Sequence, residues 1–156
     1  DPVLSRGLGD VYKRQEYQRG SNLPLFENVF LMAADEDDDA LEKDHKLAPL
    51  ARIAHAVHVY HSKNDIALDI SDYTKSNPDR LGKHGPKNIH LTSDRVVAID
   101  CHRVDETKLS HGNHQYYRKR QEVINDVVQV LAGKAPDEIK GREIVKNHPR
   151  RFRISR

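Results

Sequence analysis

The chain has 156 residues, of which 37% are hydrophobic, 32% charged and 6% aromatic, and its formal net charge is +2. This length suits a single domain, and no apolar run approaches the ~18 residues of a membrane-spanning helix, so we expect no membrane span. The single Cys101 excludes a scaffold held together by disulfides, and a net charge near zero argues against a dedicated nucleic-acid binder.

Residues 1–15 are predicted to be foreign to the protein. Ser5 to Gln15 (SRGLGDVYKRQ) is similar, over eleven consecutive residues, to the translated sequence of a sequencing-library adapter; a natural basic arm is the alternative. The native part is then expected to begin near Glu16, with the N-terminal half of the protein missing ahead of it. No apolar signal-peptide core follows the charges, and a cytoplasmic location is favoured.

The first predicted strand is the apolar run 28–34 (NVFLMAA), which is typical of a strand buried on both faces of a parallel sheet. An acidic cluster, Asp35 to Asp39, follows it and is expected to cap the next helix and otherwise to face solvent. That helix is predicted from apolar residues that recur at helical spacing: Leu47, Leu50, Ala51 and Ala54.

The second strand is predicted over 56–61 (AVHVYH), with its valines on one face and His58 and Tyr60 on the other. After a turn, 66–70 is predicted to form a short helix. The segment 76–87 contains two prolines and two glycines and is predicted to be a loop. A third strand is predicted over 96–101 (VVAIDC).

The last third of the chain is predicted to contain a loop over 102–115 and a long helix over 116–132, with Gly133 as its C-cap. Residues 135–156 are polar and basic, with seven Lys and Arg against one acidic residue from position 140 onward. We expect a solvated or partly disordered tail. A contact with nucleic acid or an anionic surface is the less favoured interpretation.

This alternation of strands and helices predicts the α/β class: a partial parallel sheet of about three strands with helices on its faces. Three strands leave two exposed sheet edges, which suits part of a larger domain. The predicted division is therefore residues 1–15 as adapter-derived, 16–134 as the domain portion, and 135–156 as the basic tail.

Polar side chains follow each predicted strand, and function collects at these positions in open α/β sheets. They are Asp35 to Asp39, Asn64 with Asp65, and His111 with His114. An acidic residue after one strand and a histidine after a later one fit the acid and base of a Ser-His-Asp triad. The sequence lacks the G-x-S-x-G turn that carries the nucleophile in α/β-hydrolases, as expected if the nucleophile precedes the first strand.

Four stretches carry a resemblance to a known family: 26–47 (FENVFLMAADEDDDALEKDHKL), 59–71 (VYHSKNDIALDIS), 77–86 (NPDRLGKHGP) and 111–117 (HGNHQYY). They resemble the C-terminal half of an α/β-hydrolase, in an uncharacterised esterase/lipase-like family of serine hydrolases. The resemblance implies that the three strands are the sixth, seventh and eighth of the hydrolase sheet, that Asp65 is the triad acid and that His114 is the base. It also implies a small-molecule ester or acyl substrate for the complete protein, whose nucleophile and oxyanion hole lie in the missing half.

Each assignment has a local alternative. Asp65 fits a helix N-cap as well, and Asp35 is the second candidate for the triad acid. His111 rivals His114, which is preferred because the tyrosines at 116–117 are expected to anchor the start of the last helix and hold the ring above the sheet.

We expect neither a cofactor nor a metal, because the acidic cluster lacks calcium-loop spacing and HGNH lacks the Glu of a helical zinc motif. The alternative function is a small non-catalytic α/β binding module that uses the acidic cluster or the basic tail. The distance between the Asp65 carboxylate and the His114 ring distinguishes the two hypotheses, since a triad pair lies within hydrogen-bond reach. The chain alone is expected to be inactive, and neither its substrate nor its oligomeric state follows from the sequence.

Overall fold

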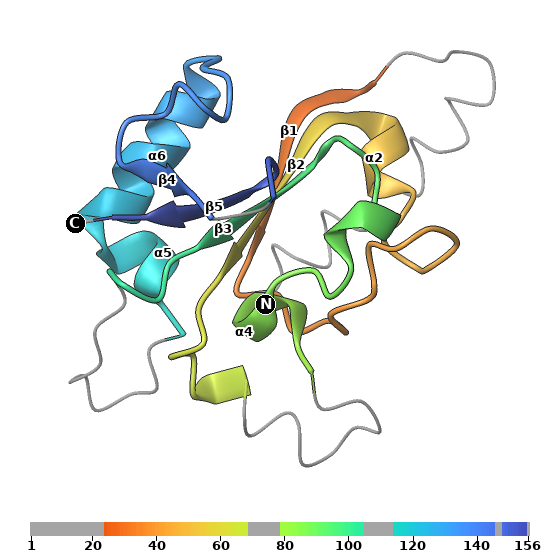
Figure 1. Cartoon of the computed structure of the whole chain (residues 1–156), viewed down its shortest axis with the longest axis horizontal. Helices are drawn as coiled ribbons and strands as arrows, with labels where there is room; N and C mark the ends of the chain where they lie inside the picture. The colour runs from red at the N-terminus through yellow and green to blue at the C-terminus, as the bar shows by residue number, and fades with distance from the viewer. Residues whose placement is uncertain (1–23, 69–78, 105–113, 146–147, 156) are drawn as a thin grey trace.

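The computed structural model describes residues 24–68, 79–104, 114–145 and 148–155. These residues form a five-stranded sheet in the order β1-β2-β3-β5-β4 (Figure 1). Neighbouring strands are parallel from β1 to β5, and β4 is antiparallel to β5. The predicted α/β class with a parallel sheet is confirmed, and the sheet is two strands wider than expected.

The three predicted strands are present with shifted ends. They are β1 (Phe26–Met32), β2 (Ala54–His61) and β3 (Val96–Asp100). In β2, Val57 and Val59 pack into one hydrophobic cluster and Tyr60 into another, on the opposite face of the sheet. Both faces of β2 are therefore buried, as expected for a strand of a parallel sheet with helices on both faces. The strand that was expected to be buried on both faces is β1, and that expectation is wrong, because its residues are half-buried or exposed at the edge of the described sheet.

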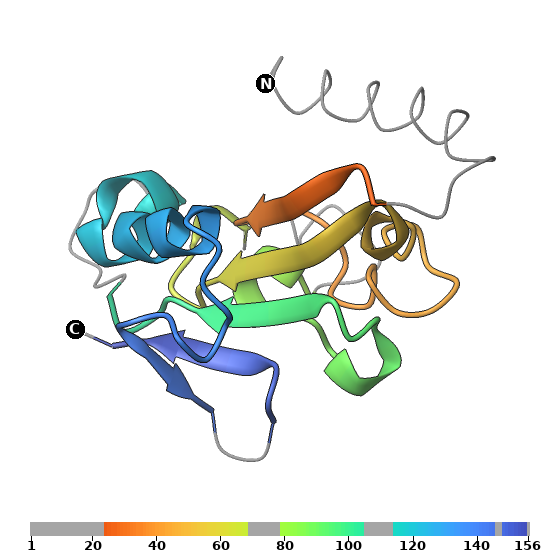
Figure 2. The ribbon, with the colours of Figure 1, turned by 90° about the horizontal axis from the view of Figure 1, so that it is seen from above.

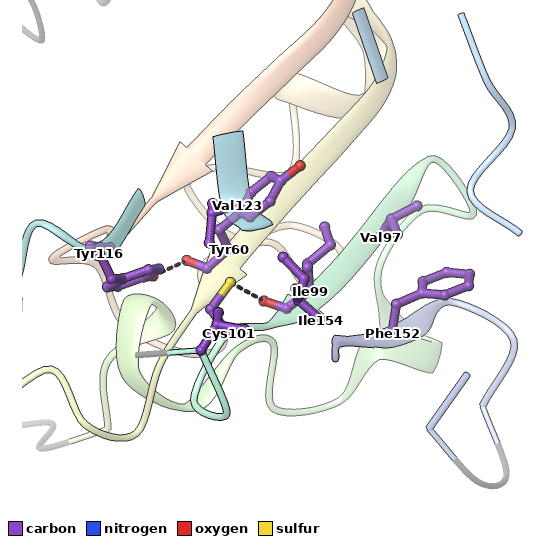
Figure 3. Close-up of a cluster of buried hydrophobic side chains, with 10 residues drawn as sticks. Tyr60, Val97, Ile99, Cys101, Tyr116, Val123, Phe152 and Ile154 are labelled. Carbon is purple, nitrogen blue, oxygen red and sulfur yellow. Dashed lines mark hydrogen bonds between the residues drawn. The ribbon is translucent and has the colours of Figure 1, made fainter. Parts of the chain in front are cut away.

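Helices cover the sheet on both sides, with α5 (Tyr116–Lys119) and α6 (Gln121–Leu131) on one side and α2 (Leu50–Ile53) and α4 (Leu81–His84) on the other (Figure 1). Figure 2 shows α5 and α6 near the end of the sheet toward which β1 and β2 run. Figure 3 shows the cluster under α5 and α6, whose labelled members are Tyr60, Val97, Ile99, Cys101, Tyr116, Val123, Phe152 and Ile154.

The helices differ from the predicted ones more than the strands do. The helix predicted over 47–54 is reduced to α2, because Ala54 already has the extended backbone (φ −127°, ψ 148°) of β2. The helix predicted over 116–132 is divided at Arg120, whose ψ of 120° ends α5 and starts α6. The predicted loop 76–87 contains α4, and of the predicted helix 66–70 only Ala67 and Leu68 are described as helical.

The expectation of a solvated or partly disordered tail is wrong for the described part of residues 135–156. This segment adds β4 (Arg142–Ile144) and β5 (Arg151–Ile154) to the sheet. In β5 the side chains alternate, so that Phe152 and Ile154 are each only 2% exposed while Arg151 and Arg153 are half-buried. The alternation of charged and apolar residues in R-F-R-I is the two-residue period of a strand with one buried face. The high charge of the whole segment led to the prediction of a solvated tail in place of a strand.

Every helix in the described ranges is too short or too polar to span a lipid bilayer.

Candidate active site

Asp65 and His114 lie in contact, although 49 positions separate them in the chain. The His114 Nδ1 atom is 2.9 Å from the Asp65 Oδ2 atom. The Asp65 side chain is 0% exposed and that of His114 is 41% exposed. The carboxylate therefore lies inside the protein, and the imidazole lies between the carboxylate and the solvent.

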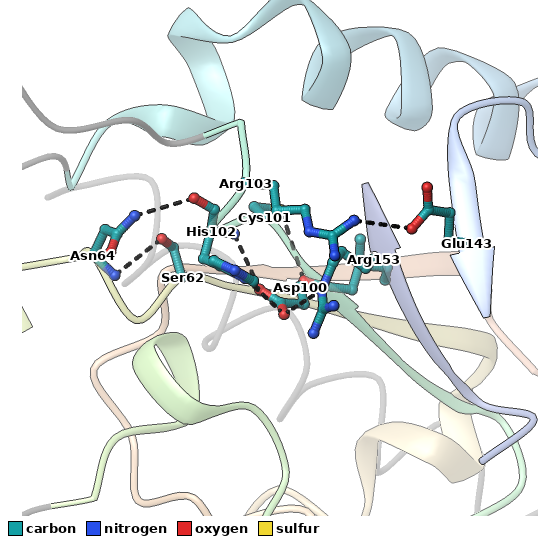
Figure 4. A network of polar contacts seen from close by, with 9 residues as sticks. Ser62, Asn64, Asp100, Cys101, His102, Arg103, Glu143 and Arg153 are labelled. Atoms are coloured by element: carbon teal, nitrogen blue, oxygen red, sulfur yellow. Dashed lines mark hydrogen bonds and ion pairs between the residues drawn. The ribbon is translucent and has the colours of Figure 1, made fainter. Parts of the chain in front are cut away.

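The turn that follows β2 positions Asp65. Its backbone N–H donates to the Ser62 carbonyl at 3.1 Å, and the Asn64 N–H donates to the Ser62 hydroxyl at 3.2 Å. The Asn64 side-chain amide also donates to the His102 carbonyl at 3.1 Å, which ties this turn to the loop after β3 (Figure 4). The turn that carries Asp65 is thus tied to the loop after β3 at the carboxyl end of the sheet.

The helix-cap alternative for Asp65 has no support in the described residues. They show no hydrogen bond from a backbone N–H at Ala67 or Leu68 to the Asp65 carboxylate, and its Oδ1 atom is buried without a partner among them.

The start of α5 positions His114, as expected for the two tyrosines that follow it. The Tyr116 hydroxyl donates to the Tyr60 carbonyl of β2 at 2.9 Å, and the Tyr116 side chain is only 2% exposed. The Tyr117 ring packs edge-on against it, with the ring centroids 5.9 Å apart. His111 lies outside the described residues, so the choice between the two histidines stays a prediction.

The surroundings of His114 stabilise its protonated form. The hydrogen bond that His114 donates to Asp65 raises the pKa of His114, and the charges of Asp65 and Asp35 raise it further, against the opposing effect of burial. The site can therefore stabilise an imidazolium, which is the form a general base takes after accepting a proton.

Asp35, the second candidate acid, follows β1 and has a different partner. Its Oδ1 atom is 3.5 Å from Nε of Arg80, and its side chain is 46% exposed. The hydrogen bond of His114 is to Asp65, and Asp35 acts on the ring through its charge. Sequence reasoning missed Arg80, because 43 positions separate it from Asp37 and no local pattern signals their ion pair.

The rest of the acidic cluster neither caps a helix nor forms a solvated face. No helix begins among the described residues 36–49, and Glu36 pairs with Lys46, Asp37 with Arg80 and Asp39 with His45. Asp38 is 4% exposed, and burial raises the pKa of its carboxyl group. The expectation for Glu36 to Asp39 is therefore wrong, because ion pairs within the chain bind the cluster to its surroundings.

The arginines of the expected tail also make contacts inside the molecule. Arg150 donates to the carbonyls of Ile89 and Ser93, both at 2.6 Å. Three others bind a carboxylate or a carbonyl: Arg142 binds Asp126, Arg151 binds the Pro86 carbonyl and Arg153 binds Asp100. These guanidinium groups hold β4 and β5 on the domain.

A second Asp–His contact lies at the carboxyl end of β3, between the last residue of the strand and the loop that follows it. The His102 Nδ1 atom is 2.8 Å from Asp100 Oδ1, and Arg153 binds the same carboxylate (Figure 4). Burial raises the pKa of Asp100, but hydrogen bonds from the His102 backbone and ring and the charges of nearby histidines together lower it. This carboxylate already serves His102 and Arg153, so it is a structural junction between β3 and β5.

Within the described part of the chain, no three His, Cys, Asp or Glu side chains gather in a way that could hold a metal ion. The absence of a cofactor and of a metal from the whole protein stays a prediction.

A mostly parallel sheet with helices on both faces, and with polar side chains at the carboxyl ends of its strands, occurs in α/β-hydrolases among other α/β proteins. The chain belongs to the family described as alpha/beta hydrolase of unknown function (DUF900), whose model matches residues 8–134. The predicted resemblance to an uncharacterised α/β-hydrolase family is confirmed. The match begins within the adapter-like stretch and ends before β4. Comparison with curated proteins and with solved structures found no match.

Proposed function

We propose that this chain supplies the acid and the base of a Ser-His-Asp triad in a serine hydrolase that acts on carboxylic esters. The observation that supports this most directly is the 2.9 Å contact between the Asp65 carboxylate and the His114 ring at the carboxyl end of the sheet. A buried carboxylate against a half-exposed imidazole is what the mechanism needs, because the imidazole must meet both its partner and the substrate.

In the proposed mechanism the Asp65 carboxylate accepts a hydrogen bond from Nδ1–H of His114 and stays ionised, which leaves Nε2 as the proton acceptor. His114 removes the proton of a serine hydroxyl as the serine oxygen attacks the ester carbonyl. The tetrahedral intermediate then collapses, His114 protonates the departing alcohol, and an acyl-enzyme remains. In the second half of the reaction a water molecule attacks the acyl-enzyme carbonyl while His114 removes its proton. His114 then returns this proton to the serine oxygen as the acyl–serine bond breaks, and the carboxylic acid is released.

The serine and the oxyanion-hole donors are proposed to come from sequence that precedes Glu16 in the complete protein. The sequence contains no G-x-S-x-G turn, so the chain offers no nucleophile of the expected kind. The predicted result for the chain by itself is no turnover of a p-nitrophenyl ester. Turnover that disappears in His114→Ala would contradict this assignment.

The alternative of a non-catalytic binding module receives less support. Its two proposed binding features are the acidic cluster and the basic tail, and both are engaged in contacts within the chain. Arg80 is 1% exposed and pairs with the cluster, and Arg142 is 1% exposed and pairs with Asp126. Charges that are bound internally contribute little to recognition of an external partner.

The decisive experiment recovers the gene sequence upstream of Glu16 and expresses the protein with that sequence in place. We expect that sequence to contain G-x-S-x-G after a buried strand, and the complete protein to hydrolyse a short-chain p-nitrophenyl ester. His114→Ala and Asp65→Asn should each lower kcat by about three to four orders of magnitude with little change in KM. The matched control is His55→Ala, at the opposite end of β2, where the ring is 56% exposed and lies 3.9 Å from Glu27.

A full-length gene without a serine elbow would overturn the proposal. So would an active full-length enzyme whose kcat is unaffected by His114→Ala.

A further inference from the structure

Two polar side chains fix the turn after β2, and they bond in different directions. The Ser62 hydroxyl accepts from the Asn64 backbone N–H at 3.2 Å, a contact within the turn. The Asn64 side-chain amide donates at 3.1 Å to the His102 carbonyl, which lies 38 positions further along the chain (Figure 4). Asparagine in a turn commonly bonds to the backbone close by. Here the Asn64 amide joins the loops that follow two neighbouring strands.

The carbonyl that accepts this hydrogen bond belongs to a residue that is itself held in place. The Asp100 carboxylate accepts from the His102 backbone N–H at 3.0 Å and lies 2.8 Å from the His102 Nδ1 atom. Arg153 of β5 donates to the same carboxylate at 3.1 Å. His102 is thus bound to the end of β3 through both its backbone and its ring. The Asn64 amide therefore bonds to an acceptor that is fixed relative to the sheet.

Asp65 directly follows Asn64, and its carboxylate must reach His114 from this turn. The Asp65 backbone N–H donates to the Ser62 carbonyl at 3.1 Å, and the Ser62 N–H donates to the Gly82 carbonyl at 3.0 Å. The turn is therefore bonded to α4 and, through Asn64, to the loop after β3. A misplacement of about 1 Å in a catalytic group can lower a rate about a hundredfold, so the attachment of this turn matters for the proposed chemistry.

We propose that Asn64 is a positioning residue for the triad acid: its side-chain amide holds the turn on the His102 carbonyl, so that the Asp65 carboxylate stays in hydrogen-bond contact with the His114 ring. This inference rests on the proposed function. Asn64 carries no charge, so its effect on His114 is exerted through the position of Asp65.

The test measures the pKa of His114 in the chain as it stands, from the histidine ring protons in NMR spectra over a pH series, with His114→Gln to assign the signal. Asn64→Leu is similar in size but has no donor for the His102 carbonyl. Among the described residues the charged groups that act on His114 are Asp65 and Asp35, and this substitution removes neither. We expect the pKa of His114 to fall by about half a unit, because a displaced Asp65 carboxylate stabilises the imidazolium less well. A loss of stability alone would not move this pKa.

A double substitution shows whether the effect runs through Asp65. Asp65→Asn should lower the pKa of His114 further than Asn64→Leu does, because it removes the carboxylate charge. Adding Asn64→Leu to Asp65→Asn should then leave the pKa unchanged. Asn64→Ser supplies the same comparison if the leucine variant does not fold, because the shorter side chain ends before the His102 carbonyl.

Asn88→Leu is the matched control. Asn88 is also half-buried, and its side-chain amide also bonds to a distant segment, in this case to the Glu42 carboxylate at 2.9 Å. Its substitution should lower the stability measured by urea unfolding and leave the pKa of His114 where it is in the wild type.

An unchanged pKa of His114 in both Asn64 variants would overturn the inference, as would an equal shift with and without the Asp65 carboxylate. Asp65→Asn by itself separates this failure from failure of the proposed function. If Asp65→Asn leaves the pKa of His114 unchanged, the Asp65–His114 pair itself is wrong. If it lowers that pKa while the Asn64 variants have no effect, the pair stands and only the role of Asn64 is lost.

Discussion

Asp65 occupies a fully buried position, and within the described part of the chain its carboxylate is hydrogen-bonded to His114. Burying a carboxylate is unfavourable unless a cation or hydrogen-bond donors compensate it. The turn from Ser62 to Asp65 makes its own backbone hydrogen bonds without using this side chain. At the residue scale, the position of Asp65 is thus explained by the ring it contacts and not by the loop it belongs to.

The Asp65–His114 pair should make the stability of the chain depend on pH. The pKa of His114 is raised from 6.5 in the folded state, so its contribution is complete below pH 6.5 and is lost as the pH rises through the folded-state value. We expect the free energy of unfolding to decline over that interval in the wild type, and this decline to be smaller in Asp65→Asn.

Urea unfolding at pH values on either side of the transition measures this difference. His55→Gln, which removes an exposed histidine far from the pair, should retain the full decline. A decline of the same size in Asp65→Asn and in the wild type would show that His114 gains nothing from Asp65.

At the scale of elements, one buried network joins α6, β2 and β4. Asp126 of α6 accepts from the Tyr60 hydroxyl at 2.5 Å and from two nitrogens of Arg142 at 2.7 and 2.8 Å. Burial and the adjacent Asp126 raise the pKa of Tyr60 well above its usual value, so the hydroxyl stays a donor. Burial, followed by the charge of Arg142, lowers the pKa of the neighbouring His58 to about 4.

Removal of one partner from this network should be costly. Asp126→Ala leaves the Arg142 guanidinium buried without a carboxylate, and we expect a loss of about 3–5 kcal/mol in the free energy of unfolding, measured by urea denaturation. The double variant Asp126→Leu with Arg142→Met should recover most of that loss. Glu143→Gln is the control: its partner Arg103 is 48% exposed, and breaking such a surface pair costs less than about 1 kcal/mol.

The predicted strands agree with the structure to within about two residues because each is a local apolar run. The helices were harder to predict, since Ala54 satisfies a helical apolar spacing and also the start of β2. The division of the last helix at Arg120 also has no local signal. The break separates two anchored residues: Tyr116 of α5, which donates to the β2 backbone, and Val123 of α6, which packs in the core.

For the whole molecule, β5 and β4 complete the sheet beside β3. Phe152 and Ile154 pack in the same core as Tyr60 and Val123. Arg150 donates to the Ile89 carbonyl and Arg153 to the Asp100 carboxylate, so this segment is also bound to the domain by hydrogen bonds. The strands that lie beyond the family match are therefore part of the folding unit.

A chain that ends at residue 134 should fold poorly. It loses Phe152 and Ile154 from the core, leaves Asp126 without Arg142 and exposes the edge of β3, which favours association between chains. We expect loss of cooperative urea unfolding together with increased light scattering. Ile144→Ser, at a tail position that is 61% exposed, should unfold like the wild type. A cooperative transition at the wild-type midpoint in the shortened chain would show that β4 and β5 are dispensable.

The sequence by itself determined the α/β class, the order and approximate ends of β1 to β3, and the residue types at the carboxyl ends of those strands. These follow from local properties, since an apolar run specifies a strand and the parallel sheet then brings the strand ends together. The tertiary structure alone decided that β5 pairs with β3, that Asp65 contacts the His114 ring while Asp35 pairs with Arg80, and that the tail arginines bind internally. A charged side chain can pair with any opposite charge that the fold brings near it, so its partner depends on long-range packing that no local pattern encodes.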